Sequence, residues 1–247
     1  MPNETPLTPM NDEQYSMFWE QESLLFENQG IYGKLIETIP DGSVVEVGCG
    51  AGLATHHLVT HRQVLAIDNN AHLLAKAKGR TIASGANVRF LEADLLDLSR
   101  RDIESIKEFA PRGIICWFIG SNPANVNQHT QGLQLNEQGK KYREEVEDLV
   151  VSRKLCSDSV EWIHLVNRAG IIDTATQEEI FRAQRDDYNT HVFNSAGFEV
   201  VDVRTFVWNR DGSNFMYAFA PNPNLQSGRP INAIVSVLAR RRAGSTK

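Results

Sequence analysis

The sequence has few cysteines, and their positions exclude several kinds of site. The three cysteines, Cys49, Cys116 and Cys156, are odd in number and widely spaced in a chain of 247 residues. Disulfide-rich secreted domains carry paired cysteines, and zinc or redox sites carry closely spaced ones. We therefore expect reduced thiols, a cytoplasmic location and no cysteine-bound metal.

Long apolar runs are also absent. No stretch approaches the roughly 20 apolar residues that a bilayer span requires. The first residues contain neither a basic start nor an apolar segment of the secretory type, so we expect no signal peptide. The hydrophobic fraction of 41% is nevertheless sufficient for a full core, and no internal repeat is visible. These features predict a globular protein that does not contact a membrane.

The chain has no excess of positive charge. It contains 25 Lys and Arg against 31 Asp and Glu, for a net charge of −6. Nucleic-acid-binding proteins usually present a basic surface, so nucleic acid is an unlikely partner. We interpret the basic run at residues 240–242 as a solvated tail that follows a last strand.

Short apolar runs alternate with segments of helical periodicity from residue 44 onward. The predicted strands span residues 44–47, 63–67, 87–91, 113–119, 160–166, 198–207, 215–220 and 231–238. The predicted helices span residues 51–60, 71–84, 99–109, 137–154 and 177–195. Near-continuous apolar strands joined by helices are typical of a parallel sheet covered on both faces, and thus of the α/β class.

Before this alternation, residues 1–10 hold three prolines and are expected to form a loose arm. Residues 11–27 are predicted to be helical, with Tyr15, Phe18 and Trp19 on one face, and a second helix precedes Pro40. We divide the chain into an N-terminal arm and helical cover (1–40) and a core (41–247). The core contains an insertion at about 120–158.

The most informative segment is a glycine-rich turn after the first strand. An apolar run containing Glu46 leads into Gly48, Gly50 and Gly52, and a helix follows. Alternating glycines let the chain turn sharply and let a ligand lie directly against the main chain. A dinucleotide-binding loop needs a third glycine or alanine at the sixth position, which here is Leu53, so an NAD-dependent oxidoreductase is disfavoured.

Two acids complete the pattern, each near the end of a later apolar run. Asp68 ends the second run and Asp94 follows the third. This three-part arrangement resembles the class I S-adenosylmethionine (SAM)-dependent methyltransferases. The resemblance implies a Rossmann-like, doubly wound, mostly parallel seven-stranded sheet with an antiparallel C-terminal strand and an N-terminal helical cover. Either 215–220 or 231–238 is a candidate for that antiparallel strand.

The resemblance also implies roles for individual residues in binding SAM. The glycine backbone would approach the methionine portion, Glu46 would favour its ammonium group, and Asp68 would accept from the ribose hydroxyls. Asp94 would accept from the adenine amino group. Asp68 as a helix cap and Asp94 as a plain surface acid remain alternatives. The expected cofactor-binding residues are Glu46, Gly48, Cys49, Gly50, Gly52, Asp68, Asn69, Asp94, Leu95 and Trp117.

Catalytic and substrate residues are less clearly indicated. His129 lies in the polar segment after the fourth strand and is our candidate for a proton acceptor. His164 lies within a strand and is expected to be a packed, hydrogen-bonded core histidine. The closely spaced His56, His57 and His61 lack an acidic ligand, so we expect no metal. The candidate substrate-binding residues are Tyr15, Trp19, Phe118 and Asn122.

We therefore expect an enzyme that moves a methyl group from SAM to an oxygen or nitrogen of a small molecule, releasing S-adenosylhomocysteine. The alternatives are an RNA or protein methyltransferase and a catalytically silent SAM-binding subunit. Ser121-Asn122-Pro123-Ala124 only partly matches the loop of enzymes that methylate nucleobase amines, since the stacking aromatic is missing. The acceptor and the oligomeric state stay open.

Overall fold

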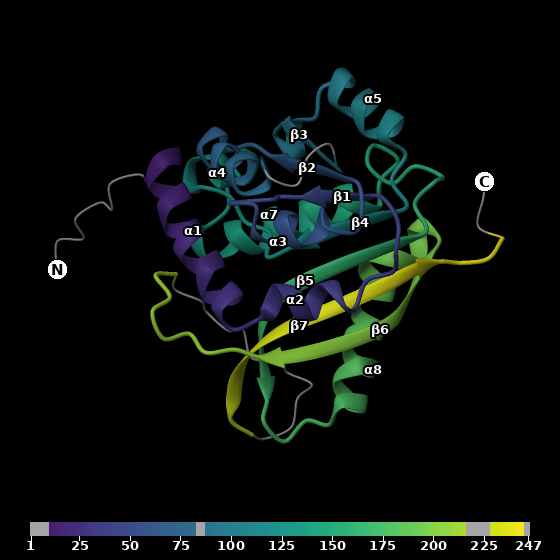
Figure 1. The fold of residues 1–247 in the computed structure, drawn as a ribbon. Coiled ribbons are helices and arrows are strands. Elements are labelled where there is room, and N and C mark those ends of the chain that lie inside the picture. The colour runs from purple at the N-terminus through teal and green to yellow at the C-terminus, as the bar shows by residue number, and fades with distance from the viewer. Residues whose placement is uncertain (1–9, 83–86, 216–227, 245–247) are drawn as a thin grey trace.

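A computed structural model describes residues 10–82, 87–215 and 228–244 and contains a seven-stranded sheet (Figure 1). The strand order is β3-β2-β1-β4-β5-β7-β6, and β7 runs antiparallel to the other six strands of this sheet. The strands are β1 (Val44–Val47), β2 (Val64–Asp68), β3 (Val88–Glu92), β4 (Gly113–Trp117), β5 (Trp162–Ile172), β6 (Phe198–Val207) and β7 (Pro230–Arg241). The order reverses at β1, so the loop after β1 lies where such sheets bind ligands.

Helices cover both faces of the sheet. The N-terminal half supplies α1 (Asp12–Asn28), α2 (Ile31–Ile36), α3 (Leu53–Leu58) and α4 (Ala71–Thr81). The rest of the chain supplies α5 (Arg100–Phe109), α6 (Pro123–His129), α7 (Leu135–Val151) and α8 (Gln177–Tyr188). After α8 come a π-helical turn, η3 (Asn189–Phe193), and a 3-10 turn, η4 (Asn194–Ala196); another 3-10 turn, η2 (Leu95–Asp97), follows β3.

Two apolar cores result from the alternation of side chains along the strands. On β1, Val45 and Val47 point to the core shared with α5, α7 and α8, whereas Val44 points to the core shared with α1 to α4. All four residues of β1 and all five of β2 and β4 are buried. This burial on both faces explains why these strands read as continuous apolar runs.

The structure assigns the antiparallel strand to β7, and thus to the predicted segment 231–238. Residues 216–220 of the other candidate lie outside the described residues. β5 continues to Ile172, beyond its predicted end at residue 166, because β7 pairs with it along its whole length, from Trp162 opposite Arg240 to Ile172 opposite Pro230. The predicted fold is confirmed, including the helical cover.

Several predicted details were wrong. The basic run is not a tail: Arg241 is in β7, donates to the carbonyls of Ser157 and Val160, and packs over Phe198. Phe18, predicted to share one face of α1 with Tyr15 and Trp19, is 38% exposed, whereas Tyr15 is 8% exposed. The polar segment after β4 contains the unpredicted helix α6, and the helix predicted at 177–195 leaves α-geometry after Tyr188.

Within the described ranges, no helix is long and apolar enough to cross a membrane. All three cysteines are buried free thiols. The division into an N-terminal cover and a core with an insertion at about 120–158 stays a prediction; α6 and α7 fall in the insertion.

One glycine in the sheet allows a buried indole to pack. A Cβ on Gly113 would lie 2.1 Å from the ring of Trp162, which is 2% exposed. We predict that Gly113→Ala lowers the free energy of unfolding by about 2–3 kcal/mol because a rigid, enclosed ring cannot move aside. Urea denaturation measures this. Gly79→Ala is the control: nothing lies within 4 Å of its Cβ position in α4, so it is expected to be stabilising by about 0.5–1 kcal/mol. Equal effects of the two substitutions would contradict the packing argument.

Candidate functional site

The turn after β1 is closed by a carboxylate from β2. Asp68 accepts hydrogen bonds from the backbone N–H of Gly50 at 2.8 Å and of Asn70 at 2.9 Å. The N–H groups of Gly48 and Cys49 both donate to the carbonyl of Ile67, each at 2.9 Å. These bonds fix the turn against the carboxyl end of β2. Asp68 therefore lies under the ligand edge of the sheet with both carboxylate oxygens engaged.

Each glycine of the turn has a positive φ and a close neighbour. The φ values are 71° at Gly48, 53° at Gly50 and 79° at Gly52, which disfavours any side chain. A Cβ on Gly52 would lie 2.5 Å from Cα of Ala77, so this glycine allows α3 and α4 to approach. A Cβ on Gly50 would lie 2.4 Å from Nε1 of Trp19. The α1 indole thus occupies the space directly over Gly50.

Glu46 is buried behind the glycine turn. It is 4% exposed, and Thr55 on α3 donates a hydrogen bond to its carboxyl group at 2.6 Å. Burial and, to a lesser degree, the nearby Asp68 charge raise the pKa of Glu46 to about 8, although the Thr55 bond acts in the opposite direction. A cation beside Glu46 would favour the ionised form. The chemistry of this group therefore fits the ammonium group of SAM.

Asp68 is buried as well, and burial raises its pKa to about 6 even though three backbone N–H groups favour the ionised form. The alternative that Asp68 caps α4 is wrong. The cap is Asn70, whose side chain accepts from the N–H groups of His72 and Leu73 at 3.0 and 3.1 Å. Helix α4 is therefore capped without Asp68, whose carboxylate bonds to the N–H groups of Gly50 and Asn70.

The structure gathers most of the predicted site residues around two small adjoining cavities. The first, of about 30 Å³, is lined by the predicted residues Tyr15, Trp19, Gly48, Asp68, Asn69, Leu95, Phe118 and Asn122. The second, of about 20 Å³, is lined by the predicted residues Trp19, Glu46, Gly48, Cys49, Trp117 and Phe118. Trp19, Gly48 and Phe118 line both. Since pockets for ligands of drug size measure roughly 300–1,000 Å³, this is a closed form of the site.

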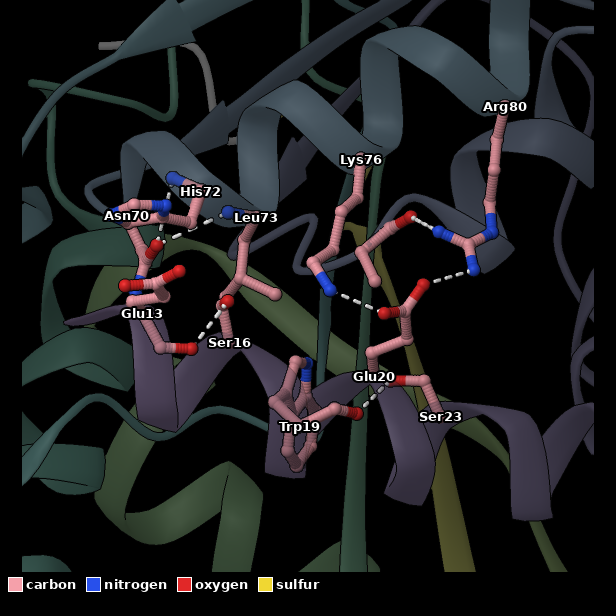
Figure 2. Close-up of polar contacts among 11 residues, drawn as sticks. Glu13, Ser16, Trp19, Glu20, Ser23, Asn70, His72, Leu73, Lys76 and Arg80 are labelled. Atoms are coloured by element: carbon pink, nitrogen blue, oxygen red, sulfur yellow. Dashed lines mark hydrogen bonds and ion pairs between the residues drawn. The ribbon is translucent and has the colours of Figure 1, made fainter. Parts of the chain in front are cut away.

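Helix α1 closes the site, and polar contacts hold it against α4. The Glu20 carboxylate lies between Lys76 and Arg80 and pairs with both (Figure 2). Partial burial acts to raise the pKa of Glu20, but these two partners keep it below the ordinary value. Arg80 also donates to the carbonyl of Ala51 in the glycine turn at 2.9 Å. Helix α1, helix α4 and the turn therefore form one connected unit.

Two further contacts fix the first turn of α1. The backbone carbonyl of Asp12 accepts a hydrogen bond from the side chain of Asn70 at 2.9 Å. The carboxylate of Asp12 accepts one from the side chain of Asn122. At the other side, the loop after β6 packs on the helix: Gln29 exchanges two hydrogen bonds with the backbone of Asn209, at 3.0 and 2.7 Å. Phe215 meets the ring of Trp19 edge-on with centroids 5.7 Å apart. The helix is thus held from two sides over the cavities.

Asp94, which follows β3, lies next to His129, the last residue of α6. Nε2 of His129 is 2.9 Å from Oδ2 of Asp94, and Asn125 donates to the same oxygen at 2.7 Å. Asp94 lines an open groove of about 440 Å³ with Asn69 and Asn122 among others, whereas His129 lines neither closed cavity. This position favours a role for His129 at Asp94 over a role as proton acceptor.

His164 is the packed core histidine that the sequence predicts. It is fully buried, accepts from Nε1 of Trp117 at 2.8 Å, and contacts the Ser236 hydroxyl at 2.6 Å. Burial lowers its pKa to about 3, so the ring is neutral. His164 therefore orients Trp117, which forms a wall of the second cavity.

Sequence reasoning missed several residues of the site. Those lining the two cavities are Ser23, Tyr32, Val47, Leu53, Ala54, Asn70, Leu73, Ile119, Gly120, Ser121 and Tyr142. Asn70 stands before a predicted helix, and Asn122-Pro123 is a common start of one, so caps could have revealed Asn70 and α6. Tyr142 comes from α7 and enters the site only through the tertiary packing.

Comparisons with known proteins agree with this geometry. A family model described as a methyltransferase domain matches residues 44–106, which include the glycine turn, Asp68 and Asp94. A search of curated proteins finds no match. Among solved structures, the cyclase SpnF is similar with a TM-score of 0.51 at 11% identity, covering 97% of this chain and 98% of that chain.

Two further solved structures are similar with lower scores. The N-methyltransferase NodS from Bradyrhizobium japonicum WM9, in complex with S-adenosylhomocysteine, has a TM-score of 0.48 and 14% identity and covers 92% of this chain and 100% of that chain. TYW2 from M. jannaschii, in complex with AdoMet, has a TM-score of 0.45 and 12% identity and covers 92% and 77%.

Residues 44–106 match a methyltransferase domain, and the sheet that contains them has the Rossmann-like strand order that the sequence resemblance implies.

The raised pKa of Glu46 generates a prediction on stability. The folded chain holds a proton on Glu46 that the unfolded chain releases above the ordinary pKa of 4.5. Stability from this proton is present below pH 4.5 and is lost as the pH rises through about 8. Glu46→Gln keeps a neutral acceptor for Thr55, so it is expected to be more stable than the parent at pH 9, on the order of 2–4 kcal/mol, and similar at pH 4.5.

Urea denaturation at the two pH values checks this. The control Glu104→Gln removes a carboxyl group that is 56% exposed and is expected to change little at either pH. A Glu46→Gln effect of the same size at both pH values would contradict the assignment of a buried, protonated acid.

Proposed function

We propose that the protein transfers the methyl group of SAM to an oxygen or nitrogen atom of a small molecule and releases S-adenosylhomocysteine. The supporting observation is the enclosure of the site: α1 lies across the glycine turn, and aromatic side chains line the cavities beneath it. A covered, aromatic-lined cavity suits a small acceptor that is held away from water. A polyanion would need an open basic groove instead.

Within this proposal the methionine portion, the ribose and the adenine of SAM would lie in turn along the carboxyl edge of the sheet, after β1, β2 and β3. Glu46 and the backbone of Gly48 and Gly50 would hold the methionine portion, and Asp68 would accept from the ribose hydroxyls. Asn69, Asp94 and Leu95 would surround the adenine. Cys49 and Gly52 belong to the turn itself, and Trp117 forms a wall of the second cavity.

SAM supplies the chemistry through a methyl group on a positively charged sulfur. The residues of the chain would align the acceptor behind that methyl and exclude water. Alignment of two reactants alone can lower a barrier by roughly 7–11 kcal/mol, so a dedicated base is not required. Tyr15, Trp19, Phe118 and Asn122 are proposed to contact the acceptor, because all four line the first cavity. A cytoplasmic location is part of the same proposal.

Methyl transfer from isotopically labelled SAM tests the proposal. The purified chain is incubated with separate panels of small hydroxy and amino compounds, RNA, and protein, and both labelled product and S-adenosylhomocysteine are measured. We expect transfer to small molecules. Transfer to RNA or protein alone would favour those alternatives. SAM binding without turnover on any panel would favour the silent subunit.

The role of Asp68 gives a second prediction. Asp68→Ala removes the carboxylate that would accept from the ribose, and we expect SAM affinity to fall by about 1–3 kcal/mol. Calorimetric titration measures the change, with Glu104→Gln as the control. Asp68→Ala also removes the hydrogen-bond acceptor of the Gly50 N–H, so thermal denaturation is used to show how much of the fold is retained. Unchanged affinity would remove the ribose assignment.

The closed cavities generate a third prediction. A ligand as large as SAM enters only if α1 moves away from the turn, and the pairs of Glu20 with Lys76 and Arg80 oppose that movement. Glu20→Gln is therefore expected to raise both the association and dissociation rates of SAM by about 3- to 10-fold. Stopped-flow tryptophan fluorescence follows the exchange, because Trp19 and Trp117 line the cavities. Glu13→Gln, at an exposed position of the same helix, is the control. Unchanged rates in Glu20→Gln would show that these ion pairs do not limit entry.

A further inference from the structure

Asp94 is held by two side chains from a single short helix. Asn125 and His129, four residues apart on α6, both contact Oδ2 of Asp94, at 2.7 and 2.9 Å. The other oxygen, Oδ1, accepts the backbone N–H of Leu96 at 3.0 Å. Residues four apart lie on the same face of a helix, so one face of α6 is directed at this carboxylate.

These contacts leave the carboxylate one free acceptor position. An ionised carboxyl group offers about four lone-pair positions, and three are taken by Asn125, His129 and Leu96. Two donors on Oδ2 restrict rotation of the group, so the remaining position on Oδ1 points in a fixed direction. An acceptor fixed in this way binds a donor of matching geometry and repels another acceptor.

The network extends into the first cavity. The Tyr142 hydroxyl donates to Oδ1 of Asn125 at 3.0 Å, which directs the amide nitrogen of Asn125 toward Asp94. Tyr142 is 3% exposed and lines that cavity. At its first turn α6 is capped by Asn122, which accepts the N–H of Asn125 at 2.8 Å and donates to Asp12 of α1. Helix α6 is thus bonded both to Tyr142 in the lining of the first cavity and to Asp12 of α1.

We propose that Asn125 and His129 are positioning residues that orient Asp94 toward the 6-amino group of the adenine. This inference rests on the proposed binding of SAM along the sheet edge. The amino group donates a hydrogen bond, which the remaining lone pair accepts. A 6-oxo purine presents an acceptor at the same position and is repelled. Helix α6, which belongs to the insertion, therefore sets the selectivity of the site for an amino-purine nucleoside.

The inference also assigns His129 a different role from that of a base. Its ring contacts Asp94 and lies 6.2 Å from the ring of Tyr142, centroid to centroid, and it is absent from the lining of both closed cavities. Loss of a positioning residue is expected to weaken binding of a 6-amino purine ligand and to leave binding of a 6-oxo purine ligand nearly unchanged.

Two ligands that differ only at that position test the proposal. Calorimetry on the full chain gives dissociation constants for S-adenosylhomocysteine and for S-inosylhomocysteine, which carries a 6-oxo group. The parent chain is expected to prefer the adenosyl ligand at least about 10-fold. His129→Ala and Asn125→Ala should weaken the adenosyl ligand by roughly 5- to 20-fold and change the inosyl ligand less than about 2-fold. His129→Gln, which retains a donor, should restore most of the preference.

Asn127→Ala is the matched control and is expected to bind like the parent, because Asn127 is an exposed residue of α6 that contacts Gln138 and does not line the groove with Asp94. Equal weakening of both ligands in the alanine variants would overturn the positioning role and indicate a general structural effect. Unchanged affinity for both ligands would overturn it as well. If the parent chain binds neither ligand, the proposed function fails and this inference fails with it. If the parent chain binds the adenosyl ligand but the alanine variants weaken both ligands equally or neither, only the positioning role is refuted.

Discussion

The hydrogen bonds between Asp68 and the glycine turn are the interaction on which the site depends. The carboxylate is nearly buried, and its ionised form is favoured by the N–H groups of Gly50 and Asn70. The N–H of Gly50 faces it because Gly48 and Gly50 adopt positive φ. The bonds join the ends of β1 and β2 and set the path of the chain into α3. One contact therefore determines both the shape of the turn and the position of the acid proposed to bind the ribose.

The three acids at the carboxyl edge of the sheet, Glu46, Asp68 and Asp94, differ in how deeply they are buried. This arrangement suits a ligand that carries charges of both signs and a net positive charge. Glu46 and Asp68 are buried and their pKa values are raised to about 8 and 6, whereas Asp94 reaches an open groove. In the closed form a neutral Glu46 avoids the cost of an unpaired buried charge. An ammonium group at this place would ionise Glu46 and thereby couple binding to release of a proton. The enclosure and the charge pattern thus support the same class of ligand.

The sequence predicted the half of the molecule whose structure is decided locally. β1 matches its prediction, and β2 and β3 lie within one residue of theirs, because buried parallel strands are short apolar runs with clear breaks. The site acids follow from the same runs. The contacts that close the site could not be predicted: Glu20 meets Lys76 and Arg80 across 56 and 60 residues. Likewise β7 is identified only by its pairing with β5 and β6, and α6 is a seven-residue helix in a segment rich in Asn and Gln.

Phe118 connects the cofactor edge to the helical cover. It has a φ of 57°, a conformation that costs a bulky residue about 1–2 kcal/mol. Its N–H donates to Val166 at 2.8 Å, and its ring stacks on Phe26 of α1 with centroids 4.6 Å apart. These contacts hold the strained residue where the chain leaves β4, and there its ring forms a wall of both cavities. A displacement of α1 removes the Phe26 contact and so changes that wall. Movement of α1 and the shape of the two cavities are consequently coupled through this side chain.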